Sequence, residues 1–150
     1  MRIKQNNISA FDAALNFITF KDRTKQEIEI KLKEKMYSLE EIDLAIDKLL
    51  EYKYIDDSNY TNRYIKSNID KKGVSRITNE LINKGVSREI ISEELSKFDF
   101  CEEDAITNEI IRKYGTEKFD DKQKSKIIGY FARRGFKYND ISRALSRACE

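Results

Sequence analysis

One turn-and-helix pattern occurs three times in this chain, about 50 residues apart. NKGVSREII occupies residues 83–91 and RRGFKYNDI occupies residues 133–141, and each ends one amphipathic run, turns at a glycine and begins another. EKMYSLEEI, at residues 34–42, has the same pattern with Met36 in place of the glycine. A period of 49 or 50 residues indicates an array of repeated units.

The apolar residues follow the same period. Two sets of equivalent positions hold isoleucine in every copy: Ile28, Ile77 and Ile127, and Ile42, Ile91 and Ile141. Around them apolar residues recur at helical spacing, and the chain has no proline and no alternating strand pattern. The sequence therefore predicts an all-α fold of three tandem three-helix repeats in an elongated, curved array, with repeats over residues 1–57, 58–100 and 101–150.

The first repeat carries clear helix-start signals. Thr24 stands before an amphipathic run at 25–35, and Ser38 precedes another run with Glu41 three residues later, the arrangement of a capping box. An earlier apolar stripe predicts a helix from about residue 9 to 20. These signals together predict the three helices of the first repeat.

The corresponding turns of the later repeats contain glycine. In the second repeat we expect helices near 58–71 and 75–84, followed by Gly85, and Gly135 has the equivalent position in the third repeat. Glycine adopts the left-handed conformation that closes a helix end without a Cβ clash. In the first repeat, Met36 must turn differently or carry strain.

Composition limits the environment and the partners. Charged residues make up 37% of the chain but the net charge is +2, which indicates neither a strongly nucleic-acid-coating protein nor an acid-binding one. The sequence shows no signal-peptide core and no membrane span, so we expect a cytoplasmic protein. Cys101 and Cys149 match no metal-ligand spacing and are expected to be reduced, partly buried thiols.

Basic residues gather in the second and third repeats. Counted over 1–58, 59–100 and 101–150, basic against acidic residues number 10 to 12, 8 to 6 and 11 to 9. The candidates for contact with a protein or DNA partner are Arg63, Lys66, Lys71, Lys72, Arg76, Lys84, Arg133, Arg134, Lys137, Arg143 and Arg147. A solvated surface is the alternative for any single lysine. Arg133 and Arg134 stand out because guanidinium groups pair bidentately.

No catalytic pattern is found. The chain has no histidine, no Walker-type loop and no dinucleotide-binding glycine motif, so we expect no enzyme, no cofactor and no metal. Adjacent carboxylates such as Asp56 and Asp57 fit the first turns of helices. Tyr60, Tyr64 and Phe131 are expected in the core because they share repeat positions with apolar residues, with base stacking as the alternative. Tyr130 lies one residue off the stripe.

The central stretch resembles a known family. YIDDSNYTNRYIKSNIDKKGVSRITNELINKGVS, at residues 54–87, is similar to the central signature of RecX, the bacterial regulator of the RecA recombinase. The matching features are the YIDD junction, Tyr60, the basic residues before Gly73, the RI and EL pairs, and the KG turn. YFARRGFKYNDI, near the C-terminus, is similar to the last-repeat motif of that family. The resemblance covers the chain from about residue 10.

The resemblance implies a non-enzymatic monomer that binds the RecA–DNA filament along its groove and inhibits or modulates strand exchange and the coupled ATPase in DNA repair. It also implies weak, sequence-independent contact with single-stranded and double-stranded DNA, and no membrane association. One alternative is a tandem helix-turn-helix protein, for which only the third repeat has a suitable helix, with Asn139, Arg143 and Arg147. A helical scaffold for another protein is the other alternative.

Overall fold

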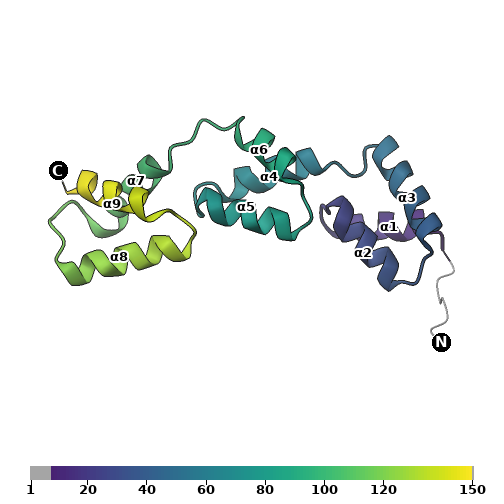
Figure 1. The fold of residues 1–150 in the computed structure, drawn as a ribbon, viewed down its shortest axis with the longest axis horizontal. Coiled ribbons are helices and arrows are strands. Elements are labelled where there is room, and N and C mark those ends of the chain that lie inside the picture. Colours follow the sequence, from purple (N-terminus) through teal and green to yellow (C-terminus); the bar gives the residue numbers. More distant parts are fainter. Residues whose placement is uncertain (1–7, 150) are drawn as a thin grey trace. The chain divides into compact units, whose positions relative to one another are not determined.

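The computed structural model describes residues 8–149, and every regular element in this range is a helix (Figure 1). The helices are α1 (Ala10–Phe20), α2 (Lys25–Glu34), α3 (Leu39–Glu51), α4 (Asp57–Asn68), α5 (Val74–Asn83), α6 (Arg88–Leu95), α7 (Glu102–Tyr114), α8 (Asp121–Arg133) and α9 (Tyr138–Ala148). Each repeat contributes three successive helices. No strand occurs between residues 8 and 149, which confirms the all-α class and the three-helix repeats.

Polar side chains begin the helices of the first repeat. Ser9, Thr24 and Ser38 each accept a hydrogen bond from the amide three residues further on. Glu27 and Glu41 bind back to the cap amides, so α2 and α3 both start with a complete capping box. Each such bond satisfies an amide that has no partner within its helix. The predicted cap and capping box are confirmed.

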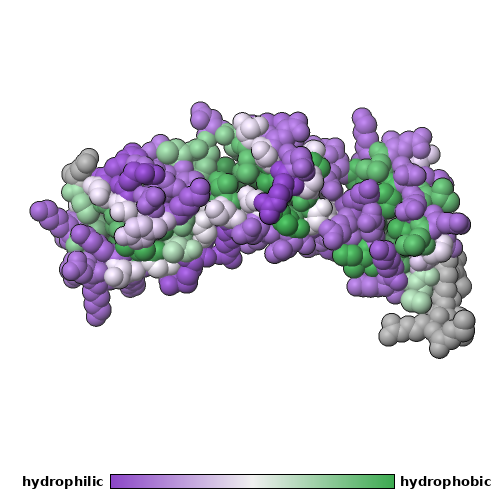
Figure 2. Space-filling model, in the orientation of Figure 1, coloured by the Kyte–Doolittle hydropathy of each residue, from purple (hydrophilic) through white to green (hydrophobic). Residues whose placement is uncertain are grey.

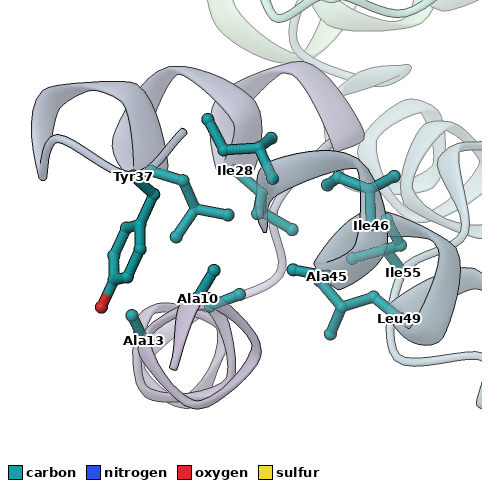
Figure 3. Close-up of a cluster of buried hydrophobic side chains, with 11 residues drawn as sticks. Ala10, Ala13, Ile28, Tyr37, Ala45, Ile46, Leu49 and Ile55 are labelled. Atoms are coloured by element: carbon teal, nitrogen blue, oxygen red, sulfur yellow. The ribbon is translucent and has the colours of Figure 1, made fainter. Parts of the chain in front are cut away.

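The core of the first repeat lies among its three helices. Ala13 of α1, Ile28 of α2 and Leu49 of α3 meet in one buried cluster (Figure 3). The deepest residues of α1 are alanines, whose small side chains let the other helices approach closely. Phe11 and Leu15, which belong to the predicted stripe of this helix, are only partly buried and pack against the cluster.

The isoleucines at equivalent positions are buried in all three repeats. Ile28, Ile77 and Ile127 are 0%, 0% and 1% exposed, and Ile42, Ile91 and Ile141 are 2%, 1% and 0% exposed. Burying one such side chain stabilises the fold by about 1.5–3 kcal/mol. The predicted register of the repeats is therefore confirmed.

The chain divides into two compact units, and the division passes through the second repeat. Unit 1 combines residues up to Arg63 with Leu81–Glu94, and unit 2 combines Tyr64–Glu80 with the residues from Leu95 onwards. Hydrophilic residues cover much of the drawn face, and patches of apolar residues are visible among them (Figure 2).

The turn between the second and third helix of each repeat contains one left-handed residue. The φ angles are 69° at Met36, 91° at Gly85 and 90° at Gly135. In each case the next amide donates to the carbonyl five residues earlier, as from Tyr37 to Leu32 over 3.2 Å. The predicted glycine turns are confirmed, and Met36 adopts the same turn under strain.

Two local predictions are wrong. The helix predicted near 58–71 ends at Asn68, whose carbonyl accepts from the amides of both Lys71 and Lys72 over 2.9 Å in the turn that follows. Cys101 is exposed rather than partly buried, while Cys149 is partly buried as expected.

Candidate partner-binding surface

Six of the eleven basic candidates form ion pairs with acidic residues. The pairs are Arg63 with Asp22, Lys72 and Arg76 with Glu80, Arg134 with Glu109, Arg143 with Glu103 and Asp140, and Arg147 with Glu103 and Asp104. An exposed pair contributes only about 0–1 kcal/mol to stability. Its larger effect here is to lower the positive charge that these side chains offer to a partner.

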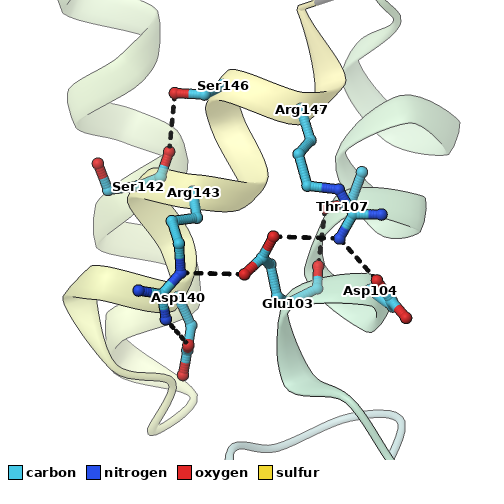
Figure 4. Close-up of polar contacts among 8 residues, drawn as sticks. All are labelled: Glu103, Asp104, Thr107, Asp140, Ser142, Arg143, Ser146 and Arg147. Carbon is cyan, nitrogen blue, oxygen red and sulfur yellow. Dashed lines mark hydrogen bonds and ion pairs between the residues drawn. The ribbon is translucent and has the colours of Figure 1, made fainter.

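Arg143 and Arg147 of α9 are held by carboxylates (Figure 4). Arg143 donates to Glu103 over 3.0 Å and to Asp140 over 2.7 Å. Arg147 donates to Glu103 over 3.1 Å and to Asp104 over 2.6 Å. The hydrogen bond to Asp140 and then that to Glu103 raise the pKa of Arg143, and those to Asp104 and Glu103 raise the pKa of Arg147.

This network weakens the helix-turn-helix alternative. A recognition helix presents unpaired side chains to base edges in the major groove. Arg143 and Arg147 would have to leave the carboxylates of α7 first, and those carboxylates would then repel the phosphates of the duplex. The helix with the most suitable sequence for reading DNA therefore uses its arginines inside the repeat.

Glu80, on α5, is the acceptor at the centre of a second cluster of polar side chains. Lys72 Nζ lies 2.8 Å from Glu80 Oε2, Arg76 Nε lies 3.1 Å from Glu80 Oε1, and the Tyr64 hydroxyl also donates to this carboxylate. Burial alone would raise the pKa of Glu80, but the hydrogen bonds from Lys72, Tyr64 and Arg76 outweigh it and lower the pKa to about 2. Lys72 thus acts within the second repeat, whereas Arg76 also donates to the backbone carbonyl of Arg133, in the third repeat, over 3.0 Å.

Four candidates are exposed and form no ion pair with any residue in the described range: Lys66, Lys71, Arg133 and Lys137. All four belong to unit 2. Lys84, in unit 1, lies beside the half-buried Tyr60, and its carbonyl accepts a hydrogen bond from Thr24. The four exposed cations are the part of the predicted set that can meet an acidic partner without breaking an existing pair.

A cleft of about 450 Å³ in unit 2 brings residues of two repeats together. Lys71 lies on its wall with Arg112 and Arg134, and the other lining residues are Asp70, Ala105, Asn108 and Glu109. Arg134 reaches Glu109 over 3.2 Å. Arg112 is 76% exposed and only 3.9 Å from the same carboxylate. Three basic side chains against two acidic ones give the cleft a positive balance.

Tyr130 is partly buried against the core of the third repeat and also contacts two residues of this cleft. Its hydroxyl donates to Glu109 over 3.2 Å, and the Arg134 guanidinium lies 4.5 Å from its ring centre. Lys113 lies 3.8 Å from the same ring centre. Phe131, the next residue, is fully buried as predicted, whereas Tyr60 and Tyr64 are only half-buried.

Sequence reasoning missed Arg112 and Lys113. They end α7 in the segment IIRKY, and neither lies in the helices where basic residues cluster along the sequence. A basic last turn is a common helix signal, so it does not distinguish these residues from helix stabilisers. Only the packing of α7 against the turn at Lys71 brings Arg112 to the cleft.

Between residues 8 and 149, no group of three His, Cys, Asp or Glu side chains is placed to hold a metal ion. None of the helices in that range is both long and apolar enough to cross a membrane. Three successive three-helix repeats define the class of this chain as an all-α helical-repeat protein.

The particular family follows from comparison with known proteins. Residues 10–49, 56–95 and 102–145 match the first, second and third three-helix domains of RecX. The chain belongs to the RecX family. Regulatory protein RecX of Clostridium acetobutylicum is 34% identical over 151 residues, covering 95% of this chain and 70% of that protein. The one from Finegoldia magna is 36% identical, covering 91% of this chain and 70% of that protein.

Solved structures agree on the fold. The crystal structure of RecX from Lactobacillus salivarius matches with a TM-score of 0.77 at 24% identity, covering 93% of this chain and 94% of that one. A second crystal structure of regulatory protein RecX matches with a TM-score of 0.73 at 22% identity, covering 91% of this chain and 71% of that one. The relatives are named regulatory proteins, which supports a RecX regulatory role here.

Proposed function

We propose that this chain is a non-enzymatic regulator that binds the RecA filament on DNA along its groove and inhibits strand exchange and the coupled ATPase. The observation that carries the proposal is the match of all three RecX three-helix domains, in order, along residues 10–145. A regulator of this kind acts as a monomer in the bacterial cytoplasm. Sequence-independent contact with single-stranded and double-stranded DNA is part of the same proposal.

The exposed cations supply the means of contact. Lys66, Lys71, Arg133 and Lys137 can approach phosphates or carboxylates without breaking an ion pair to a described residue. Neutralising phosphates releases counterions, so such contact weakens as salt rises. With a net charge of only +2, DNA contact by itself is expected to be weak and the protein filament to be the main partner.

The direct test is titration of this chain into a RecA ATPase assay on single-stranded DNA. We expect inhibition at less than one molecule per RecA subunit, because a filament-bound regulator acts on neighbouring subunits. Strand exchange measured in parallel should fall over the same concentration range. Unchanged ATPase and unchanged strand exchange at a molar excess of the chain would rule the proposal out.

A charge-reversal variant tests the surface. Lys71→Glu with Arg133→Glu changes two exposed residues that have no ion pair, so helicity by circular dichroism should stay the same. We expect the concentration for half-inhibition to rise about tenfold, equivalent to about 1.4 kcal/mol of binding free energy. Lys21→Glu with Lys33→Glu is the matched control, since it makes the same charge change on exposed residues of the first repeat. Equal loss in both variants would show a general charge effect and refute this surface.

A further inference from the structure

The first and second repeats meet where α2 begins. Thr24 Oγ1 donates to the carbonyl of Lys84, in the turn between α5 and α6, over 2.6 Å. The Lys25 amide donates to Asp57 Oδ1, at the start of α4, over 3.0 Å. An amide in the first turn of a helix has no partner within that helix. Here the partner is a carboxylate of α4, the first helix of the second repeat, which begins at Asp57, one residue before the boundary used above. We refer to these contacts as the first joint.

The second and third repeats meet in the same way where α5 begins. The Gly73 amide donates to the carbonyl of Arg134, in the turn between α8 and α9, over 2.8 Å. The Val74 amide donates to Glu102 Oε1, at the start of α7, over 2.6 Å. Lys25 and Val74 are 49 residues apart, one repeat period. We refer to these contacts as the second joint, and each joint lies wholly within one compact unit.

Glycine lets the two repeats of each joint approach. A Cβ atom at Gly85 would overlap the side chain of Gln26, in the first turn of α2. A Cβ atom at Gly135 would overlap Arg76 Cβ and lie 3.0 Å from the Arg76 backbone nitrogen. Both glycines therefore serve a close contact as well as a left-handed turn.

The first repeat lacks both features of a joint. At the turn it has Met36, with a side chain in the direction where Gln26 packs against Gly85 and Arg76 packs against Gly135. At the start of α1 it has Ala10, which has no carboxylate to offer. The combination of a glycine turn and a carboxylate at the first position of the repeat is confined to the two repeats that pack against a preceding one.

At each joint, two adjacent acidic residues bind different partners. Asp56 Oδ1 accepts from the Asn59 amide over 3.1 Å and so caps its own helix, while Asp57 caps α2. In α7, Glu103 binds the two arginines of α9, while Glu102 caps α5. Asp56 and Glu103 thus carry the same charge as their neighbours but bind within their own repeats.

We propose that Asp57 and Glu102 are positioning residues that fix each repeat onto the next by capping a helix of the preceding repeat, and that the oxygen acceptor, not the negative charge, is what the joint requires. A carboxamide of the same length keeps an acceptor oxygen at the site. Loss of the side chain leaves a helix-start amide without its partner, which costs more than a hydrogen bond gains.

The surroundings of the two carboxyls support an acceptor role. Burial raises the pKa of Asp57, although the Lys25 amide acts in the opposite direction. Burial likewise raises the pKa of Glu102, against the effect of the Val74 amide. Ionisation is therefore disfavoured at both sites in the folded state, and a neutral acceptor avoids that penalty.

Amide hydrogen exchange at Val74 tests the second joint. In Glu102→Ala we expect exchange at Val74 to rise about tenfold or more relative to its neighbours in α5, because the carboxylate that accepts its hydrogen bond is lost. In Glu102→Gln the rate should stay within about threefold of the unmodified chain. Glu103→Ala is the matched control and should leave Val74 unchanged. Wild-type exchange in Glu102→Ala, or equal acceleration in Ala and Gln, would overturn the proposal.

The first joint provides an independent repeat of the experiment. Asp57→Ala should accelerate exchange at Lys25, and Asp57→Asn should not. Asp56→Ala is the control, since it removes the cap of α4 and leaves the acceptor for Lys25 in place. If the Ala variants lose helicity, the Asn and Gln variants still decide the outcome, because acceleration in these folded proteins would show that charge is required.

The functional consequence rests on the proposed function. An extended partner meets several repeats at once, so a loosened joint should reduce multivalent binding. We expect Glu102→Ala to inhibit the RecA ATPase about tenfold less potently and Glu102→Gln to keep its potency. If the unmodified chain does not inhibit, the proposed function fails, whereas the exchange rates at Val74 and Lys25 still confirm or overturn the joints.

Discussion

The turn in the first repeat and the turns in the later repeats have the same backbone but different residues. Met36 has a φ of 69°, and Gly135 has a φ of 90°. Both turns close their helix with the same pattern of hydrogen bonds. At Gly135, as at Gly85, the start of another helix packs against the turn. A left-handed turn therefore admits a side chain in this fold, and the contact with the preceding repeat is what demands glycine.

The largest effect expected from this comparison is that of Gly135→Ala. The left-handed conformation costs an alanine about 1–2 kcal/mol, and forcing a Cβ against Arg76 adds about 1–3 kcal/mol. We therefore expect the free energy of unfolding of the part that contains the second joint to fall by about 3 kcal/mol. Urea unfolding followed by circular dichroism measures this loss.

Two further variants separate the effect of the contact with Arg76 from the effect of the left-handed backbone angle at position 135. Gly135→Asn tolerates the left-handed conformation better than alanine but still has a Cβ, so it should remain destabilising by about 2 kcal/mol. Gly129→Ala, within α8, meets only the flexible end of Arg133 and should stabilise the helix by about 0.5–1 kcal/mol. If asparagine at position 135 restored full stability, backbone conformation alone would explain the glycine.

The repeats themselves could be predicted because their cause is local and periodic. Ile28, Ile77 and Ile127 recur at one period, and a buried helix face needs an apolar residue at the same place in each copy. Ser38 with Glu41 marks a helix start within four residues. Such signals depend only on neighbours in the chain, so one sequence is sufficient to find them.

The joints could not be predicted from the sequence, because their contacts join residues that are far apart in the chain. The sequence pattern predicts that Asp57 stabilises its own helix, but its carboxylate accepts from the amide of Lys25, 32 residues earlier. Arg143 is a sequence candidate for partner contact, but Glu103 holds it from 40 residues away. Sequence shows which residues carry charge, whereas packing between helices decides which charges are paired.

Acid has opposite effects on the stability contributed by two carboxyls near α5, that of Glu80 in its ion-pair cluster and that of Glu102 at the second joint. The pH dependence therefore distinguishes the cluster from the joint. The pKa of Glu80 lies at about 2, below its ordinary value of 4.5, so its stabilising effect is present above pH 4.5 and is lost as the pH falls towards 2. The pKa of Glu102 is raised above 4.5, so its protonation adds stability as the pH falls through that raised pKa towards 4.5 and changes little further below it. Acid thus weakens the Glu80 cluster and not the joint.

Glu80→Gln measures the first of these effects. We expect the unmodified chain to lose about 1 kcal/mol more stability than Glu80→Gln between about pH 5 and pH 2.5, allowing for solvent screening of a cluster in which Glu80 is 25% exposed. Glu102→Gln over the same range is the matched control and should not reduce the acid sensitivity. Parallel pH profiles for the unmodified chain and Glu80→Gln would contradict the assigned role of the cluster.

The smallest expected effect is that of Met36→Gly, which makes the first turn resemble the other two. The substitution removes about 1–2 kcal/mol of left-handed strain but adds about 0.5–1 kcal/mol of chain entropy to the unfolded state. The Met36 side chain is 43% exposed, so few contacts are lost, and a net gain of about 0.5 kcal/mol should raise the melting temperature by about 1–2 °C. Met36→Ala keeps the strained angle and should give no such gain. A loss of stability in Met36→Gly would mean that the methionine packs usefully at this turn, and the contrast with Gly85 and Gly135 would then lie in what each turn contacts rather than in strain.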